Sequence, residues 1–196
     1  MRFGCLAIAI LTTGCVVPFA IPPMRGELGS STRVGHAGEA GSSSLHAAAG
    51  THIASGTQRR DQPYDIGVGW TFEQTRLTTS HGIYADAAAF IDRTRRTRTS
   101  IGGRGELRTM TLGYAAAAKL RIDTEVYTPT KQSFSGSDHC GAIAGAYHGI
   151  SAVGLFAEAG RVWSTEPDGD AWVATAGVSM RIPSALGIYL GIPGCK

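Results

Sequence analysis

The sequence predicts an all-β protein, an antiparallel up-and-down β-barrel of about 8 to 10 strands. Beyond residue 24, apolar side chains recur at every second position, which is the periodicity of a strand with one apolar face. No stretch has a convincing helical periodicity. With 27 glycines and only 17% charged residues in 196 positions, the composition is that of neither a disordered chain nor a typical helical enzyme. This length fits a single domain.

The first residues have the features of a cleaved signal peptide. Arg2 supplies a short positive region, and Phe3 to Leu11 form a mostly apolar run. A helix that crosses a bilayer needs about 20 apolar residues, and Thr12 to Gly14 interrupt this run well before that length. We therefore expect residues 1–14 to be a signal peptide and not a transmembrane anchor.

The segment Leu11-Thr12-Thr13-Gly14-Cys15 resembles a bacterial lipobox, in which the cysteine thiol receives a diacylglycerol before cleavage makes it the first residue. It departs from the usual pattern at Thr12, where an aliphatic residue is common. The resemblance implies a lipid on Cys15 and a lipidated tether over residues 15–24. Val16 is not the aspartate that commonly retains lipoproteins at the inner membrane, which points to the outer membrane of the bacterial envelope. An ordinary cleaved signal peptide and a buried helical hairpin are the alternatives.

The cysteines agree with export. Cys5 leaves with the signal peptide and Cys15 carries the lipid, so Cys140 and Cys195 remain as a pair in an oxidising compartment. We predict a disulfide between them, with two free thiols as the alternative. In the chain-entropy model, closing a loop of about 55 residues stabilises the fold by roughly 3 to 4 kcal/mol.

The strands follow from the alternation. From Tyr64 to Glu73, the apolar side chains occupy the even-numbered positions, and from Lys119 to Glu125 every odd-numbered position is charged. The same alternation continues from Trp172 to Ile182 and from Leu186 to Ile192. Strands are expected near residues 25–34, 44–56, 63–74, 82–92, 102–113, 116–128, 141–148, 152–163, 171–182 and 186–192.

The connections between these strands differ in length. Gly149-Ile150-Ser151 is expected to be a tight turn, and Pro183-Ser184-Ala185 is expected to close a hairpin. The stretches Thr128 to His139, Ser164 to Asp170 and Asp92 to Ser100 are longer and polar. Tight turns at one rim and longer loops at the other are typical of transmembrane barrels.

In this pattern, most of residues 25–192 resemble the small outer-membrane β-barrels of Gram-negative bacteria, although the chain has no diagnostic motif. Aromatic residues near strand ends suit the interfacial girdles of such barrels; they are Tyr64, Phe72, Tyr127, Trp163 and Trp172. The chain departs from the class at its end, which is Ile192-Pro193-Gly194-Cys195-Lys196 where such barrels usually end on an aromatic residue. The resemblance implies a lipid-anchored, non-enzymatic barrel with a structural or interaction role and outer-membrane lipid as its partner.

The alternative is a soluble periplasmic barrel that is held by its lipid and binds a small apolar ligand. The two hypotheses place one set of charges on opposite sides of the wall. In a membrane barrel these charges fill the interior as pairs, whereas in a soluble barrel they face water. They are Asp86, Arg104, Glu106, Arg108, Lys119, Arg121, Asp123, Glu125 and Glu158.

The sequence gives little indication of a catalytic, metal or cofactor site. The sequence predicts no catalytic residues, no metal and no cofactor, because its six histidines are scattered and it has neither a nucleophile elbow nor a phosphate loop. Paired carboxylates such as Glu106 and Glu158 would suit a glycosidase only at a separation that the sequence does not give. The net charge of +3 and the exported chain argue against nucleic acid.

One basic cluster stands out. Four arginines, Arg93, Arg95, Arg96 and Arg98, lie within six residues between two expected strands. Guanidinium groups bind phosphates bidentately, so this loop is a candidate contact for phospholipid or lipopolysaccharide headgroups. The alternative is a solvated loop that keeps a hairpin soluble.

Overall fold

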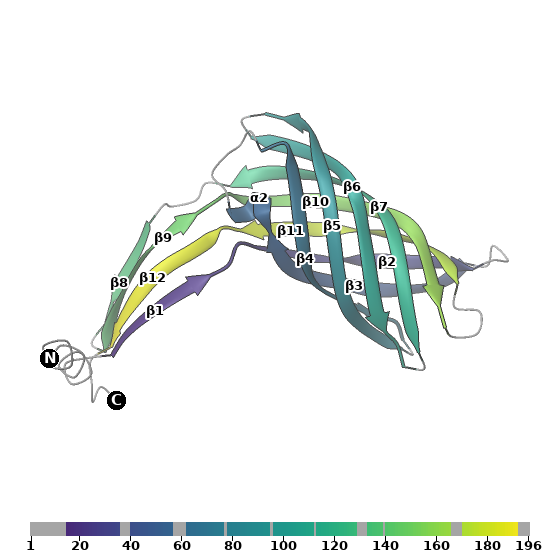
Figure 1. The fold of residues 1–196 in the computed structure, drawn as a ribbon, viewed down its shortest axis with the longest axis horizontal. Helices are drawn as coiled ribbons and strands as arrows, with labels where there is room; N and C mark the ends of the chain where they lie inside the picture. Colours follow the sequence, from purple (N-terminus) through teal and green to yellow (C-terminus); the bar gives the residue numbers. More distant parts are fainter. Residues whose placement is uncertain are drawn as a thin grey trace, which may run out of the picture.

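The structure is a computed structural model that describes residues 15–35, 40–56, 62–76, 78–94, 96–111, 113–128, 133–138, 140–165 and 170–191. Eight antiparallel strands close into a barrel in the order β2-β3-β4-β5-β6-β7-β10-β11 (Figure 1). This confirms the predicted fold class. The barrel strands are β2 (Met24–Gly35), β3 (Ala40–His52), β4 (Tyr64–Gln74), β5 (Thr79–Arg93), β6 (Thr97–Thr109), β7 (Tyr114–Thr128), β10 (Ser151–Ser164) and β11 (Ala171–Ile182).

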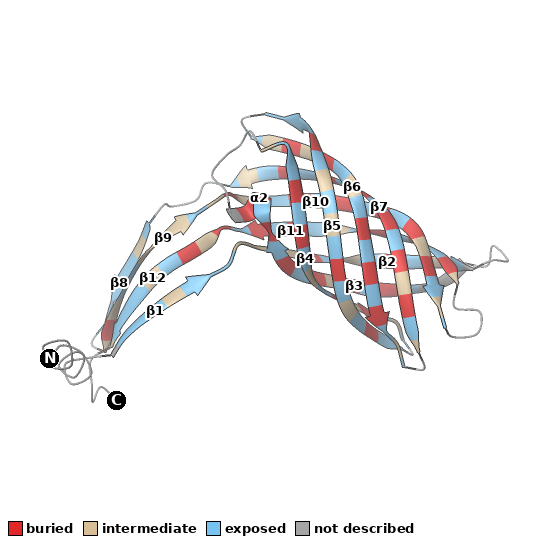
Figure 2. Ribbon diagram, viewed as in Figure 1, coloured by how far each residue is buried: buried red, intermediate tan, exposed pale blue. Residues whose placement is uncertain are grey.

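Long, continuous ladders hold the barrel wall. The longest ladder joins β7 and β10 from Ala115 opposite Ser164 to Thr128 opposite Ser151, and β11 pairs with β2 to close the ring. Most strands follow the sequence in order, since β8 and β9 alone intervene between β7 and β10. Side chains alternate between the two faces of each strand, and Figure 2 shows the resulting stripes of buried and exposed residues along the wall.

The remaining four strands form a second sheet, which we call the extension sheet. It consists of β1 (Cys15–Ile21), β8 (Ser133–Ser137), β9 (Gly141–His148) and β12 (Ser184–Gly191), in the order β1-β12-β9-β8. Along the chain, each of these strands lies next to one of four neighbouring barrel strands, β2, β11, β10 and β7, in the same spatial order. The extension sheet therefore continues half of the barrel wall beyond one rim. It bends away from the barrel, so that the two form an arch (Figure 1).

We call the rim from which the extension sheet leaves the near rim, and the opposite one the far rim. The short helix α2 (Ile53–Gly56) follows β3 at the near rim. The β5–β6 turn is also there, closed by a hydrogen bond from the Thr94 amide to the Thr97 carbonyl (2.8 Å). The β2–β3, β4–β5, β6–β7 and β10–β11 connections lie at the far rim. The described residues contain no helix that is long and apolar enough to cross a membrane.

Two predicted turns are wrong. The chain does not form a hairpin at Pro183-Ser184-Ala185, because β11 pairs with β10 and β2, whereas β12 pairs with β9 and β1. Likewise Gly149-Ile150-Ser151 joins β9 to β10 without pairing them with each other. A short break between two alternating runs fits a hairpin and a bend between successive strands equally well, and only the pairing partners distinguish them.

Gly149 shows why the second break is a bend. Its φ is +120°, a region that side-chain-bearing residues rarely adopt, and a Cβ there would lie 2.0 Å from the Ser55 carbonyl oxygen. Position 149 therefore requires glycine for two reasons, the positive φ of its backbone and its close approach to α2.

Other differences concern short elements. β1 occupies the stretch expected to be a tether, and its residues pair with β12 from Cys15 opposite Gly191 to Ile21 opposite Ala185. β8 lies inside the expected 128–139 loop. The expected 92–100 loop is mostly strand, because β5 runs to Arg93 and β6 begins at Thr97. A five-residue serine-rich strand has too little alternation to be recognised from sequence.

Candidate functional site

The barrel interior is the most distinctive site in the molecule, because it is filled with charge. All nine charged residues that the sequence analysis placed on one face of the wall point inward, and eight of them are at most 4% exposed. Among the described residues, ion pairs inside the barrel join eight cations to eight carboxylates, so that their formal charges balance. The cations are Arg25, Arg33, Arg98, Arg104, Arg108, Lys119, Arg121 and Arg181, and the carboxylates are Glu27, Asp65, Glu73, Asp86, Glu106, Asp123, Glu125 and Glu158.

The centre of this network is a cluster that spans the barrel from wall to wall. Two nitrogens of Arg104 donate to both oxygens of Glu27, at 2.7 and 2.9 Å. Arg104 also contacts Asp86 at 2.8 Å and Glu158 at 3.1 Å. Arg121 binds both Glu27 and Glu158, at 3.0 and 2.5 Å. Bidentate guanidinium–carboxylate pairs of this kind are the strongest and most geometrically defined ion pairs in proteins.

From the centre, the network reaches the far rim. Lys119 binds Glu158 at 3.3 Å and Glu106 at 2.8 Å. Arg108 then joins Glu106 to Glu73. Glu73 accepts a further hydrogen bond from the Ser44 hydroxyl at 2.6 Å. The charges are thus continuous from the middle of the barrel to its far end.

A second branch closes the near rim together with α2. Arg181 binds Glu125 at 2.7 Å and Asp65 at 2.6 Å, and it also donates to the Ser55 hydroxyl at 3.1 Å. The other oxygen of Asp65 accepts a hydrogen bond from the backbone amide of Ala54, at 3.0 Å. Ser55 is fully buried and Ala54 is nearly so. The helix is therefore held across the near end of the interior by the same charges that fill it.

Aromatic rings complete the interior. The guanidinium of Arg104 lies 4.2 Å from the ring centre of Tyr84, and that of Arg121 lies 4.4 Å from the ring centre of Phe156. The Tyr84 hydroxyl is within 3.0 Å of His52, whose other ring nitrogen lies 3.1 Å from Asp65. These rings pack between the charged side chains of the interior.

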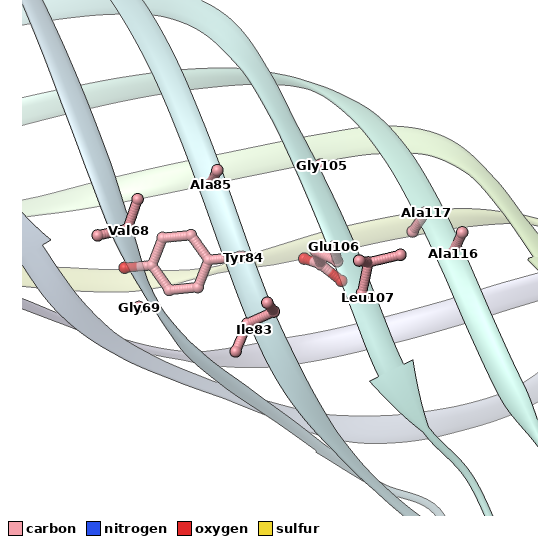
Figure 3. Close-up of a pocket in the computed structure, with 10 residues that line it drawn as sticks. All are labelled: Val68, Gly69, Ile83, Tyr84, Ala85, Gly105, Glu106, Leu107, Ala116 and Ala117. Atoms are coloured by element: carbon pink, nitrogen blue, oxygen red, sulfur yellow. The ribbon is translucent and has the colours of Figure 1, made fainter.

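The outer surface of the barrel is apolar, in contrast to its charged interior. It carries bare apolar side chains along every strand, of which Leu120 and Leu155 are 74% and 68% exposed. A hollow of about 650 Å³ crosses β4 to β7 on this outer wall (Figure 3). Val68, Ile83 and Leu107 line it where Gly105 and Ala85 leave space between them. Its position shows that the apolar hollow belongs to the outside of the barrel and not to the interior.

The three described arginines of the basic cluster do not all point the same way. Arg93 and Arg96 are exposed at the near rim, and Arg93 donates to the Gln62 carbonyl at 3.2 Å. Arg98 instead points into the barrel, where it binds Glu125 at 2.7 Å and lies 4.5 Å from the ring centre of Phe90. Arg95 lies outside the described residues. Of the three described arginines, Arg93 and Arg96 are therefore open to a headgroup at this rim, whereas Arg98 is not.

The structure describes the backbone of Cys15 and Cys140 but not Cys195. The Cys15 backbone begins β1 at the tip of the extension sheet. Cys140 lies in the turn between β8 and β9, where its amide donates to Asp138 at 2.8 Å. Cys195 lies outside the described residues, as does the expected signal peptide, so both the disulfide and the lipidation stay predictions.

The carboxylates considered for catalysis take part in ion pairs of the interior. Glu106 and Glu158 bind the same ammonium, that of Lys119, and their side chains are fully buried. Of the histidines, His46 and His52 are buried inside the barrel, His81 and His148 are exposed, and His36 and His139 lie outside the described residues.

Sequence reasoning missed about half of the interior charges. Asp65, Glu73 and Arg181 lie on the face opposite to the apolar positions of their strands. The alternation that predicted the positions of Lys119 to Glu125 could therefore have placed these three residues inside the barrel as well. Arg25 and Glu27 stand in a glycine- and serine-rich strand whose apolar positions are too few to assign a face. Comparison of the chain with known protein families and with curated proteins finds no match.

Proposed function

We propose that this protein is an integral outer-membrane β-barrel lipoprotein, non-enzymatic, with a structural or interaction role in the bacterial envelope. One observation carries the proposal: the barrel has a charged, ion-paired interior and an apolar exterior. In water this arrangement exposes many large apolar side chains and buries many ions. In a bilayer the same exterior is solvated by lipid, and the alternation of apolar-out and polar-in residues is that of membrane barrels.

The dimensions support this assignment. Barrel strands of 11 to 15 residues exceed the roughly 9 to 11 residues that a tilted strand needs to cross the hydrocarbon layer. Aromatic side chains point outward near the far rim, where Tyr114, Trp163 and Trp172 are 69%, 43% and 62% exposed. Tyr64 has the same position near the opposite end, at 50% exposed. Aromatic rings at both ends of a barrel suit the two membrane interfaces.

The filled interior supports a structural or interaction role over a transport role. In the described interior, sixteen charged side chains pair with one another and α2 lies across one end, as expected of a filled barrel and not of an open pore. A barrel that binds a small apolar ligand would need an apolar interior cavity, whereas the apolar hollow here lies on the outer wall. The exposed Arg93 and Arg96 at the near rim suit contact with lipid phosphates.

The test is fractionation of expressing cells, followed by gel mobility of heated and unheated samples. We expect the protein to resist alkaline carbonate, to require detergent and to show a heat-dependent shift in mobility. The matched variant Cys15→Ala removes only the predicted lipid, and we expect it to remain in the membrane fraction because the barrel itself is embedded. Release of this variant into the soluble fraction, without a heat shift, would instead support the lipid-anchored soluble barrel.

A further inference from the structure

The extension sheet is uncharged. Its four strands contain no Asp, Glu, Lys or Arg, whereas each of the barrel strands that they continue, β2, β7, β10 and β11, carries at least one charged residue. The register divides its side chains between two faces. The aromatic face carries Phe19, Phe134, Tyr147 and Tyr189, and the aliphatic face carries Val16, Leu186, Ile188 and Leu190.

The aromatic face is covered in part by its own side chains, while Val17, Ile21 and Tyr189 on this face are 50%, 44% and 39% exposed. The rings of Phe134 and Phe19 have their centres 6.0 Å apart, and Tyr147 lies 4.9 Å from Phe134 on the other side. Phe134 and Phe19 also lie over Gly145 and Gly187, where an added Cβ would meet ring atoms at 2.3 and 2.6 Å. Aromatic rings that cover glycines on neighbouring strands are a known means of stabilising a sheet. This face thus has a local packing partner.

The aliphatic face has no such cover in the described part of the chain. Val16, Leu186, Ile188 and Leu190 are 43% to 53% exposed. The face is also continuous with the outer surface of the barrel. Across Pro183 the alternation is unbroken, since Ile182 and Leu186 are exposed while the residues between them are buried or half-buried.

The backbone decides which apolar environment this face can enter. Among the described residues, β1 and β8 each pair on one side only, so the sheet has two open edges. Open edges do not occur within the hydrocarbon of a bilayer, because unpaired amides and carbonyls find no partners there. At the membrane interface, the edges are hydrated while one face is buried about 5 to 10 Å deep, as in interfacial amphipathic segments.

We propose that the extension sheet lies on the surface of the membrane that the barrel crosses, with its aliphatic face docked on lipid. The inference rests on the proposed function and adds a second, monotopic lipid contact at the near rim. The sheet bends away from the barrel (Figure 1), and a bend of this kind would lay it along the surface of the membrane. It also places Cys15 at the far tip, where the predicted lipid would enter the same leaflet.

Neighbouring residues on opposite faces provide the test. In full-length protein whose three tryptophans, Trp70, Trp163 and Trp172, are replaced by Phe, a single tryptophan is introduced as Ile188→Trp or as Tyr189→Trp. A third variant, Val68→Trp, reports on the outer wall of the barrel. Each is reconstituted into vesicles of phosphatidylethanolamine and phosphatidylglycerol with brominated acyl chains, which quench tryptophan on contact.

We expect bromine to quench Ile188→Trp several-fold more strongly than Tyr189→Trp, and Val68→Trp to be quenched as well. Quenching of Val68→Trp alone would overturn the docking and leave the membrane barrel intact. Absence of quenching in all three variants would overturn the proposed function itself. Equal shielding of both sheet positions from aqueous iodide, without bromine quenching and with the mass of two copies, would mean that the sheet binds a second copy instead.

Discussion

Arg104 illustrates how the interior depends on single residues. It is fully buried and contacts Glu27, Asp86 and Glu158, so its removal leaves buried carboxylates short of a counter-charge. We expect Arg104→Met to lower the free energy of unfolding by about 3 to 5 kcal/mol, the usual cost of breaking a buried ion pair. Guanidinium unfolding of the protein reconstituted in vesicles measures this change.

The matched control is Arg161→Met. Arg161 pairs with Asp170 at 3.6 Å on the outer surface, where both side chains are 38% exposed. The pair lies close to the far rim, beside the interfacial Trp163, where water reaches it, and the loss of such an exposed pair costs about 0 to 1 kcal/mol. Similar losses of stability in the two variants would mean that the interior charges are hydrated rather than mutually paired.

Leu120 tests the outer wall at the same scale. It lies in the middle of β7, is 74% exposed, and neighbours the buried Lys119 and Arg121. In water, an exposed Leu→Arg change has little effect on stability, whereas at the centre of a bilayer it costs about 2 to 4 kcal/mol. We therefore expect Leu120→Arg to destabilise the protein in vesicles by that amount. Thr111→Arg, in the exposed β6–β7 turn, should unfold like the wild type, and equal stability of the two variants would argue against lipid contact.

Among the elements, the long strands were predictable and the bends were not. Strong alternation located β4, β7, β10 and β11 within about two residues at each end, because each has one apolar and one polar face. β1 and β8 were missed, since a proline-containing apolar run and a serine-rich run have no clear period. The pairing of β9 and β12 in a separate sheet was also missed, because alternation says which residues share a face and not which strands are neighbours.

Gly149 gives a prediction at the scale of elements. It joins β9 to β10 with a positive φ and lies against α2, so alanine there is strained in its backbone and clashes with the Ser55 carbonyl. We expect Gly149→Ala to destabilise the protein by about 1 to 3 kcal/mol and to increase protease cleavage between the barrel and the extension sheet. Gly105→Ala is the control, because a Cβ at Gly105 meets nothing within 4 Å. Equal protease resistance of the two variants would show that the bend tolerates a side chain.

At the scale of the whole molecule, the ion pairs, α2 and the extension sheet act together, because one half of the barrel wall continues into the sheet at the rim that α2 closes. The interior charges join strands on opposite sides of the barrel, as Glu27 of β2 and Arg104 of β6 do. Contacts of this kind tie opposite sides of the wall together through the interior. The barrel is therefore expected to be rigid and closed, and to serve as a membrane-embedded support for the extension sheet.

Conductance measures this closure directly. In planar bilayers, we expect the wild-type protein to insert without producing steady current steps, since paired charged side chains fill the cross-section at the centre of the barrel. The double variant Glu27→Ala with Arg104→Ala removes one charge of each sign from the centre, so it keeps the interior neutral while it empties the cross-section. We expect measurable conductance only in this variant, with heat-dependent gel mobility as the control that both proteins are inserted. Steady conductance by the wild type would show that the interior network opens in a membrane, and the protein would then be a pore rather than a support.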